Sequence, residues 1–172
     1  LAHRDIDGCI AECDAILDDD PDAEEIWKLR GDALELAGRD PFDSYREAIS
    51  VRRSYHEAWC ATAEAWFLRG ENEKARECIE KALEVHPKNV CAMVQAARIS
   101  LAEAKEGGDA GRLDFGFDQC TMAAMLSPRD YDVQTALAEI GLEKGRMQSS
   151  AGALESSLKT LEIARDLDGC QN

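Results

Sequence analysis

Residues 59–87 constrain the fold of this chain more than any other stretch. Read at helical period, they give a helix with two tryptophans seven residues apart, Trp59 and Trp66, and a stop at Gly70. A second helix follows and is closed by Pro87. Two short helices joined by a tight turn cannot bury their apolar faces alone, so the pattern predicts a stack of several such pairs.

The spacing resembles the tetratricopeptide repeat (TPR), a helix–turn–helix unit with the pattern W-x2-L-G-x2-Y, then A-x3-F, then P. Its positions are filled here, loosely in letters but correctly in spacing, by Trp59, Thr62, Ala63, Trp66, Ala75, Ile79 and Pro87. The resemblance implies an all-α fold, a right-handed α-solenoid (superhelix) of antiparallel helix pairs with about nine helices and no strand. It also implies that the tryptophans Trp27, Trp59 and Trp66 belong to the core.

Units of this kind extend over the whole chain, which we expect to form a single TPR-like domain over residues 1–172. The predicted organisation is a half unit at 1–23, repeats at 24–55, 56–89 and 90–130, and a last unit at 131–172 that ends in a C-terminal capping helix. The half unit is either part of a longer array or an N-terminal cap. The start at Leu1 is typical of a piece of a longer protein.

Three local features predict helix ends. Asp22 and Glu25 have the spacing of a capping box at the start of a helix. Gly145 is expected to end the helix that begins near residue 131. The extra residues at 105–115 predict either a long loop or an extension of both flanking helices.

Charge and composition bound the partner. Lys and Arg total 20 against 35 Asp and Glu, a net charge of −15, which argues against a nucleic acid or an anionic membrane and favours a basic protein or peptide. No apolar run approaches the roughly 18–20 residues of a spanning helix. The seven cysteines include no CxxC pair, which predicts reduced thiols and a cytoplasmic location rather than a disulfide framework.

The resemblance implies a concave groove lined by the first helix of each pair. The groove residues proposed on this basis are Glu25, Lys28, Asp32, Glu57, Cys60, Glu64, Phe67, Val94, Arg98, Leu101 and Glu139. The same register adds Glu35, Cys91, Asp132, Thr135 and Leu142. Carboxylates fall at both ends of the set and apolar side chains in its middle, so the groove is expected to hold a segment with apolar anchors and basic flanks.

The sequence therefore predicts a protein–protein interaction scaffold that binds a basic, partly apolar segment. One alternative is an ordinary solvated face on an acidic protein, and another is a self-associating structural or oligomerisation module. A receptor for the C-terminal carboxylate of chaperones is not expected. Of the clamp that such TPR domains use, only Lys28 is present, and Asp32 would repel a carboxylate.

No sequence motif indicates an enzyme. A phosphate loop, HExxH and GxSxG are absent, so we expect no catalytic residue and no cofactor. Cys9 and Cys13 are spaced to share a helix face, but a structural zinc site usually takes four ligands, so they are expected to be packing residues and no metal site is predicted.

Overall fold

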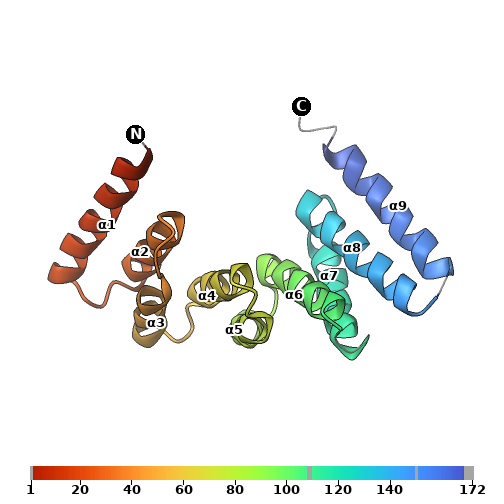
Figure 1. The fold of residues 1–172 in the computed structure, drawn as a ribbon, viewed down its shortest axis with the longest axis horizontal. Helices are drawn as coiled ribbons and strands as arrows, with labels where there is room; N and C mark the ends of the chain where they lie inside the picture. The colour runs from red at the N-terminus through yellow and green to blue at the C-terminus, as the bar shows by residue number, and fades with distance from the viewer. Residues whose placement is uncertain (1, 108–109, 150, 169–172) are drawn as a thin grey trace. The chain divides into compact units, whose positions relative to one another are not determined.

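The structure, a computed structural model, describes residues 2–107, 110–149 and 151–168 of the chain. Within these ranges the regular secondary structure is helical throughout, with no strand (Figure 1). The helices are α1 (Ala2–Asp19), α2 (Glu24–Leu36), α3 (Phe42–Val51), α4 (His56–Leu68), α5 (Asn72–Val85), α6 (Val90–Lys105), α7 (Ala110–Leu126), α8 (Tyr131–Met147) and α9 (Ala151–Asp168). The predicted all-α architecture of about nine helices is thereby confirmed for the described residues.

The helices divide between two compact units, unit 1 (Leu1–His86) and unit 2 (Pro87–Asn172). In unit 1, α1 packs on α2, α2 on α3 and α4, α3 on α4, and α4 on α5. In unit 2, α6 packs on α7 and α8, α7 on α8, and α8 on α9. The pairs α2/α3, α4/α5, α6/α7 and α8/α9 fall within the predicted repeats. The single domain and the right-handed superhelix stay predictions.

Glycines and side-chain caps set several of the helix ends. Gly38 and Gly70 follow α2 and α4 with φ of +69° and +76°, the left-handed conformation that closes a helix at low cost for glycine. Asn89 accepts a hydrogen bond from the backbone N–H of Ala92 at 3.1 Å and so caps α6. Asp130 caps α8 in the same way, accepting from Val133 N–H at 3.2 Å.

Two of the expected helix ends are wrong. Gly145 lies buried inside α8, which continues to Met147, because packing of the helix offsets the weak helix propensity of one glycine. The N-cap residue of α2 is Ala23 rather than Asp22, and no side chain caps this end. Instead Glu24 N–H bonds to the backbone carbonyl of Asp22 at 3.0 Å, in a turn.

The extra residues at 105–115 are used mainly as helix. α6 runs to Lys105 and α7 begins at Ala110, so both helices are extended. α6 has 16 residues where α2 and α4 have 13 each. The first helix α6 is consequently longer than the first helices α2 and α4 of unit 1, and this extension shapes the site described below.

Aromatic side chains tie the helices of unit 1 together. The ring of Trp66 on α4 stacks on Phe42 of α3 with centroids 3.8 Å apart. Trp27, half-buried, packs against a buried cluster of Ala48, Tyr55 and Ala58. Trp27 and Trp66 are therefore packing residues, but all three tryptophans are only partly buried, so the expectation that they belong to the buried core is met in part.

The cysteines are mostly packing residues as well. Cys13, Cys60, Cys78 and Cys120 are buried, and Cys170 lies outside the described residues. Burial raises the pKa of the Cys78 thiol and that of the Cys120 thiol to about 11 each. A raised pKa keeps these thiols protonated and weakly reactive near neutral pH.

Candidate functional site

The first helices of successive pairs lie side by side within each unit. α2 packs on α4 in unit 1, and α6 packs on α8 in unit 2 (Figure 1). We call these two surfaces the α2/α4 face and the α6/α8 face. All of the proposed groove residues come from these four helices, so each face is a candidate binding surface within its own unit.

The proposed groove residues differ widely in exposure. Glu25, Glu57, Glu64, Arg98 and Glu139 are exposed, and Lys28, Asp32 and Phe67 are half-buried. Cys60, Val94 and Leu101 are buried, with 7%, 6% and 8% of their surface exposed. The charged members are therefore accessible to a partner, whereas most of the expected apolar middle offers little surface.

On the α2/α4 face, internal contacts already hold some of the carboxylates. Lys28 Nζ forms an ion pair with Asp32 Oδ2 at 2.6 Å, one helical turn along α2. The Tyr45 hydroxyl donates a hydrogen bond to the other oxygen of Asp32 at 3.0 Å. Burial, together with the nearby charges of Asp32 and Glu35, raises the pKa of Tyr45. Both carboxylate oxygens of Asp32 are thus bound by side chains of the protein itself.

A second carboxylate links the two helices of this face. Glu35 on α2 and Arg69, which follows α4, approach to 3.5 Å. Burial raises the pKa of Glu35, and the Arg69 charge opposes that shift. The charges of Glu64 and Asp32 raise the pKa of Glu35 further, which shows that acidic groups from α2 and α4 gather near one another.

On the α6/α8 face the helices are also bridged by charge. Arg98 on α6 and Asp132 on α8 are 3.6 Å apart, and both side chains are largely exposed. An exposed pair of this kind contributes about 0–1 kcal/mol and breaks easily. Arg98 is therefore accessible to a partner despite the pairing.

A cavity of about 360 Å³ opens on the α6/α8 face. Its lining residues are Leu101, Lys105, Glu139, Leu142, Glu143, Arg146 and Leu154. The structure thus brings together three residues that the register assigned to the groove, Leu101, Glu139 and Leu142. The remaining lining residues were not predicted.

Two of the four missed residues lie one helical turn beyond predicted ones. Lys105 follows Leu101 by four positions on α6, and Arg146 follows Leu142 by four positions on α8. Their positions result from the extension of both helices, which the repeat pattern does not contain. Treating the extra residues at 105–115 as helix is the sequence signal that would have found Lys105.

A second cavity, of about 310 Å³, lies between α7, α8 and α9. Its polar side chains are largely engaged within the protein. Lys144 pairs with Asp114 at 2.7 Å and lies 4.5 Å from the centre of the Phe117 ring. Thr121 and Thr160 donate their hydroxyl hydrogens to backbone carbonyls of their own helices. None of the proposed groove residues lines it.

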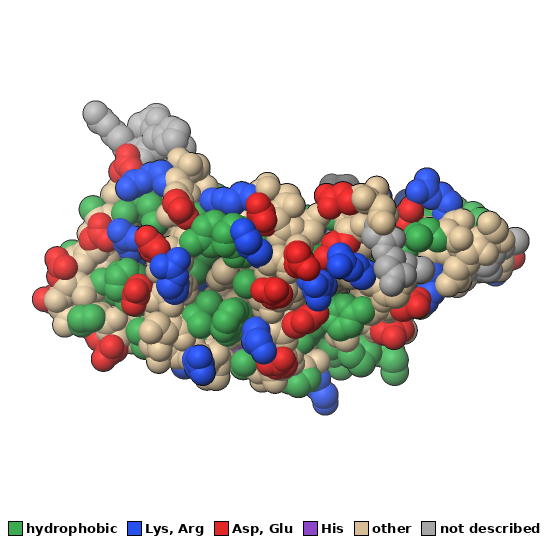
Figure 2. Space-filling view, turned by 60° about the horizontal axis from the view of Figure 1, so that its bottom comes forward, with side chains coloured by type: hydrophobic (Ala, Val, Ile, Leu, Met, Phe, Trp, Pro, Cys, Tyr) green, Lys and Arg blue, Asp and Glu red, His purple; other side chains and the backbone are tan. Residues whose placement is uncertain are grey.

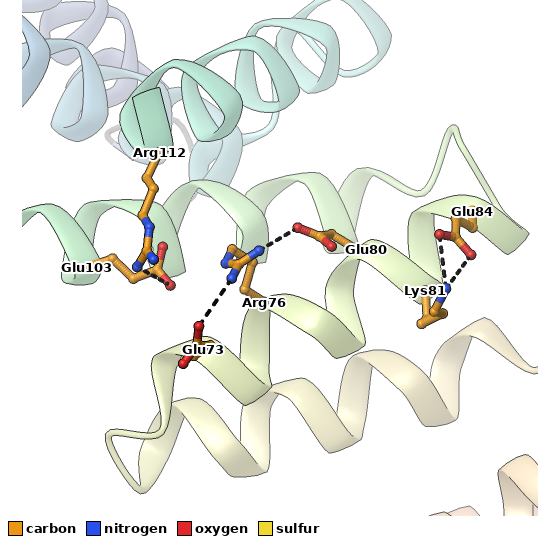
Figure 3. A network of polar contacts seen from close by, with 7 residues as sticks. All are labelled: Glu73, Arg76, Glu80, Lys81, Glu84, Glu103 and Arg112. Carbon is orange, nitrogen blue, oxygen red and sulfur yellow. Dashed lines mark hydrogen bonds and ion pairs between the residues drawn. The ribbon is translucent and has the colours of Figure 1, made fainter. Parts of the chain in front are cut away.

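Many of the basic residues are paired with carboxylates outside the two faces. Figure 3 shows Arg76 on α5, which lies 2.9 Å from Glu80 and 3.8 Å from Glu73. In unit 2, the same figure shows Arg112 at 3.3 Å from the buried Glu103. Accordingly, Figure 2 shows Lys and Arg side chains next to Asp and Glu side chains over the surface in view. The basic residues therefore form no continuous patch in that view.

Among the described side chains, no group of three or more His, Cys, Asp or Glu residues is arranged to hold a metal ion. None of the helices, over the residues described, has the length and apolar character needed to cross a membrane.

Comparison with known proteins bears on the family and the fold. The family model of the tetratricopeptide repeat matches residues 56–89. A search of curated proteins finds no match. A crystal structure of MamA aligns with a TM-score of 0.74 and 17% identity, over 97% of this chain and 91% of that chain. The structure of YrrB, described as a TPR protein with an unusual peptide-binding site, aligns with a TM-score of 0.68 and 17% identity, over 95% and 78%.

At these identities the structural likeness shows the fold. The match at 56–89 coincides with α4 and α5, the stretch whose residue spacing indicated the family. The tetratricopeptide repeat assignment is thereby confirmed: residues 56–89 form one such repeat, and the chain has the helical fold of tetratricopeptide repeat proteins.

Proposed function

We propose that the chain is a protein–protein interaction scaffold whose α2/α4 face and α6/α8 face each bind a partner segment. The observation that carries this proposal is the cavity on the α6/α8 face. Leu101, Glu139 and Leu142 were assigned to a groove from their place in the repeat, and they line one cavity although they come from two helices. A concave site with apolar walls and a few charged groups is typical of a binding site.

The charge distribution supports a partner with basic residues. In the sequence of unit 1, Asp and Glu outnumber Lys and Arg two to one, whereas the two kinds are closer to balance in unit 2. Glu25 on α2 and Glu57 on α4 are exposed, and they lie on the face where the acidic groups gather. Such a surface attracts basic segments and speeds their association.

The affinity is expected to be modest. Phe67 is half-buried, and Cys60 and Val94 are buried, so a partner gains little apolar contact area from them. Exposed charge pairs add about 0.2–1 kcal/mol each. A short segment is therefore expected to bind with a dissociation constant of roughly micromolar order. The solved structure of YrrB is that of a TPR protein with a peptide-binding site, which is consistent with this mode of binding.

A display selection of random peptides against the whole chain tests the proposal. We expect the enriched peptides to carry Lys or Arg beside apolar residues. The double variant Glu25→Lys/Glu57→Lys reverses charge on the α2/α4 face and is expected to bind these peptides several-fold more weakly. Because both side chains are exposed, the variant should fold normally.

The matched control carries the same charge change on second helices. Glu47 on α3 and Glu77 on α5 are exposed, so Glu47→Lys/Glu77→Lys alters net charge equally without altering either face. The control is expected to retain peptide binding. Absence of enriched peptides, or an equal loss of binding in both variants, would contradict the proposal.

Self-association is the second candidate, and one surface favours it. Met122, Met125 and Leu126 are exposed on the last turns of α7, and Met125 has 79% of its surface exposed. Apolar clusters on a surface are common at contacts between proteins. Sedimentation over a concentration series tests this candidate, which predicts a mass that increases with concentration and a loss of that increase in Met125→Glu. A constant monomeric mass contradicts it.

A further inference from the structure

We infer that the cavity on the α6/α8 face takes one large apolar side chain of a partner segment that carries an acidic residue beside α6 and a basic residue beside α8. This inference rests on the proposed function and names the chemistry of the partner at one of its two faces.

Three leucines supply the apolar part of the cavity wall. Leu101 from α6, Leu142 from α8 and Leu154 from α9 line it, and all three are buried or half-buried. Its volume of about 360 Å³ is near the lower end of the roughly 300–1,000 Å³ found for ligand pockets. A space of this size between three leucines suits one large apolar side chain better than it suits an extended ligand.

Two of the four charges at the cavity neutralise each other. Arg146 Nη2 and Glu143 Oε1 on α8 are 2.7 Å apart. The Glu143 side chain is only 12% exposed, so its carboxylate is held within the wall. This pair therefore contributes little net charge to the rim.

The other two charges are available to a partner. Lys105 on α6 and Glu139 on α8 are both exposed, and neither forms an ion pair with any other side chain that the structure describes. They have opposite sign and stand on different helices. The rim of the cavity is therefore positive on its α6 side and negative on its α8 side.

Charge complementarity then determines the partner at this face. An acidic residue of the partner is favoured near Lys105 and a basic residue near Glu139, with the apolar side chain between them. A segment with basic residues on both sides would meet Lys105 with like charge. The α6/α8 face thus selects a mixed-charge segment and fixes the direction in which it binds, whereas the α2/α4 face favours a basic one.

The experiment is a display selection of random peptides against the whole chain in four forms. These are the wild type, Lys105→Glu, Glu139→Lys, and the double variant Lys105→Glu/Glu139→Lys. For the wild type we expect a class of peptides with an apolar residue flanked by an acid on one side and a base on the other. The double variant is expected to enrich the same class again, because its exchanged charges still complement one acidic and one basic flank when the peptide binds in the opposite direction.

Each single variant changes one flank only. Lys105→Glu is expected to replace the preference for an acidic flank by a preference for a basic one. Glu139→Lys is expected to replace the preference for a basic flank by a preference for an acidic one. For one synthetic peptide of the wild-type class, each substitution should weaken binding about two- to fivefold, the range that corresponds to one exposed ion pair. Lys159→Glu on α9 is the control, because this exposed lysine does not line the cavity, and it should leave both flanks unchanged.

The outcomes separate this inference from the proposed function. If peptides are enriched but their flanking charges do not respond to Lys105→Glu and Glu139→Lys, the inference is wrong and the proposed function stands. A matching response in Lys159→Glu also contradicts the inference, because it shows an effect of net charge alone. If the wild type enriches no peptide, both the inference and the proposed function are wrong.

Discussion

The indole Nε1 of Trp59 donates a hydrogen bond of 3.0 Å to the backbone carbonyl oxygen of Arg53, six residues earlier. The same contact recurs at the same spacing from Trp27 to Pro21, at 2.8 Å. Each of these carbonyls lies two residues after the end of the preceding helix, so the bond ties the first turn of a first helix to the connection before it. The repeat thus preserves a side-chain-to-backbone contact as well as an apolar pattern.

The last unit keeps this contact without a tryptophan. Gln134 Nε2 donates to the carbonyl of Pro128 at 3.0 Å, again across six residues. In the third unit the corresponding residue is Met93, whose side chain has no N–H to donate. Three of the four units therefore keep the side-chain donor, and the third unit fills the position with an apolar residue alone.

Trp59→Phe is expected to destabilise the chain by about 1 kcal/mol, because it keeps an aromatic ring and removes the donor to the Arg53 carbonyl. Urea denaturation followed by circular dichroism measures the change as a lower midpoint. Trp27→Phe should behave alike, since its bond to Pro21 has the same form. An unchanged midpoint in both variants would show that these bonds add no net stability.

Gly31→Ala is expected to destabilise the chain by roughly 1–3 kcal/mol, because the added Cβ would clash with the ring of the fully buried Tyr45. Gly8→Ala in α1 is the matched control. A Cβ there meets nothing within 4 Å, so the gain in helix propensity should stabilise by about 0.5–1 kcal/mol. Thermal unfolding of the two variants should therefore shift in opposite directions, and shifts of equal sign would contradict the close approach of α2 and α3.

Stability is expected to fall as the pH rises above about 10. Burial raises the pKa of Tyr45 in the folded chain, so the unfolded chain loses this proton first and gains stability relative to the native state. The pKa of Tyr55 is raised by burial as well and acts in the same direction. Each such tyrosine contributes a decline of up to about 1.4 kcal/mol per pH unit.

Urea unfolding from about pH 9 to about pH 11 measures this decline. Tyr45→Phe removes one titrating group, so its stability should depend less steeply on pH than that of the wild type. Equal slopes would mean that the Tyr45 hydroxyl titrates alike in the folded and unfolded chains, contrary to its buried bond with Asp32.

The stacked rings of Phe42 and Trp66 are expected to be coupled by about 0.5–1.5 kcal/mol. A double-mutant cycle with Phe42→Leu and Trp66→Leu measures this coupling by denaturation. As a control, Phe42→Leu is combined with Trp27→Leu, because Trp27 packs in a different cluster with Ala48 and Tyr55. Additive changes in both cycles would show that the stacking contributes nothing beyond burial.

Cys78 and Cys120 are expected to react slowly with iodoacetamide in the native protein. With a pKa of about 11 for each thiol, only about one part in a thousand is thiolate near pH 8. Mass spectrometry of labelled peptides before and after addition of urea follows the reaction, which should accelerate on unfolding. Equally fast labelling of both residues in native protein would contradict their burial.

The repeat pattern was sufficient to predict the helices of unit 1. Trp59, Gly70 and Pro87 mark a helix, its stop and the end of the next helix, and these are local signals that a chain carries in its residue order. Amphipathic spacing then predicts which residues face the neighbouring helix, and Tyr45 and Ile79 are fully buried as large packing residues should be. The all-α class and the TPR repeat were therefore determined by the sequence.

Only the tertiary structure decided which proposed groove residues a partner can reach. Register assigns Cys60 and Val94 to the groove, but neighbouring helices cover both, because the exposure of a residue depends on what packs beside its helix. Likewise, Asp32 is engaged by Lys28 and Tyr45, and the latter lies on another helix. No local pattern contains these contacts.

The cavity on the α6/α8 face has some lining residues that the sequence predicted and others that depend on tertiary structure. Sequence placed Leu101, Glu139 and Leu142 on this surface, because one residue in each helical turn faces the same way. The other part of the wall, including Lys105 and Arg146, exists because α6 and α8 continue by a turn, in α8 through a glycine that alone would have ended it. Packing between helices stabilised those extra turns, so tertiary structure rather than residue order completed the site.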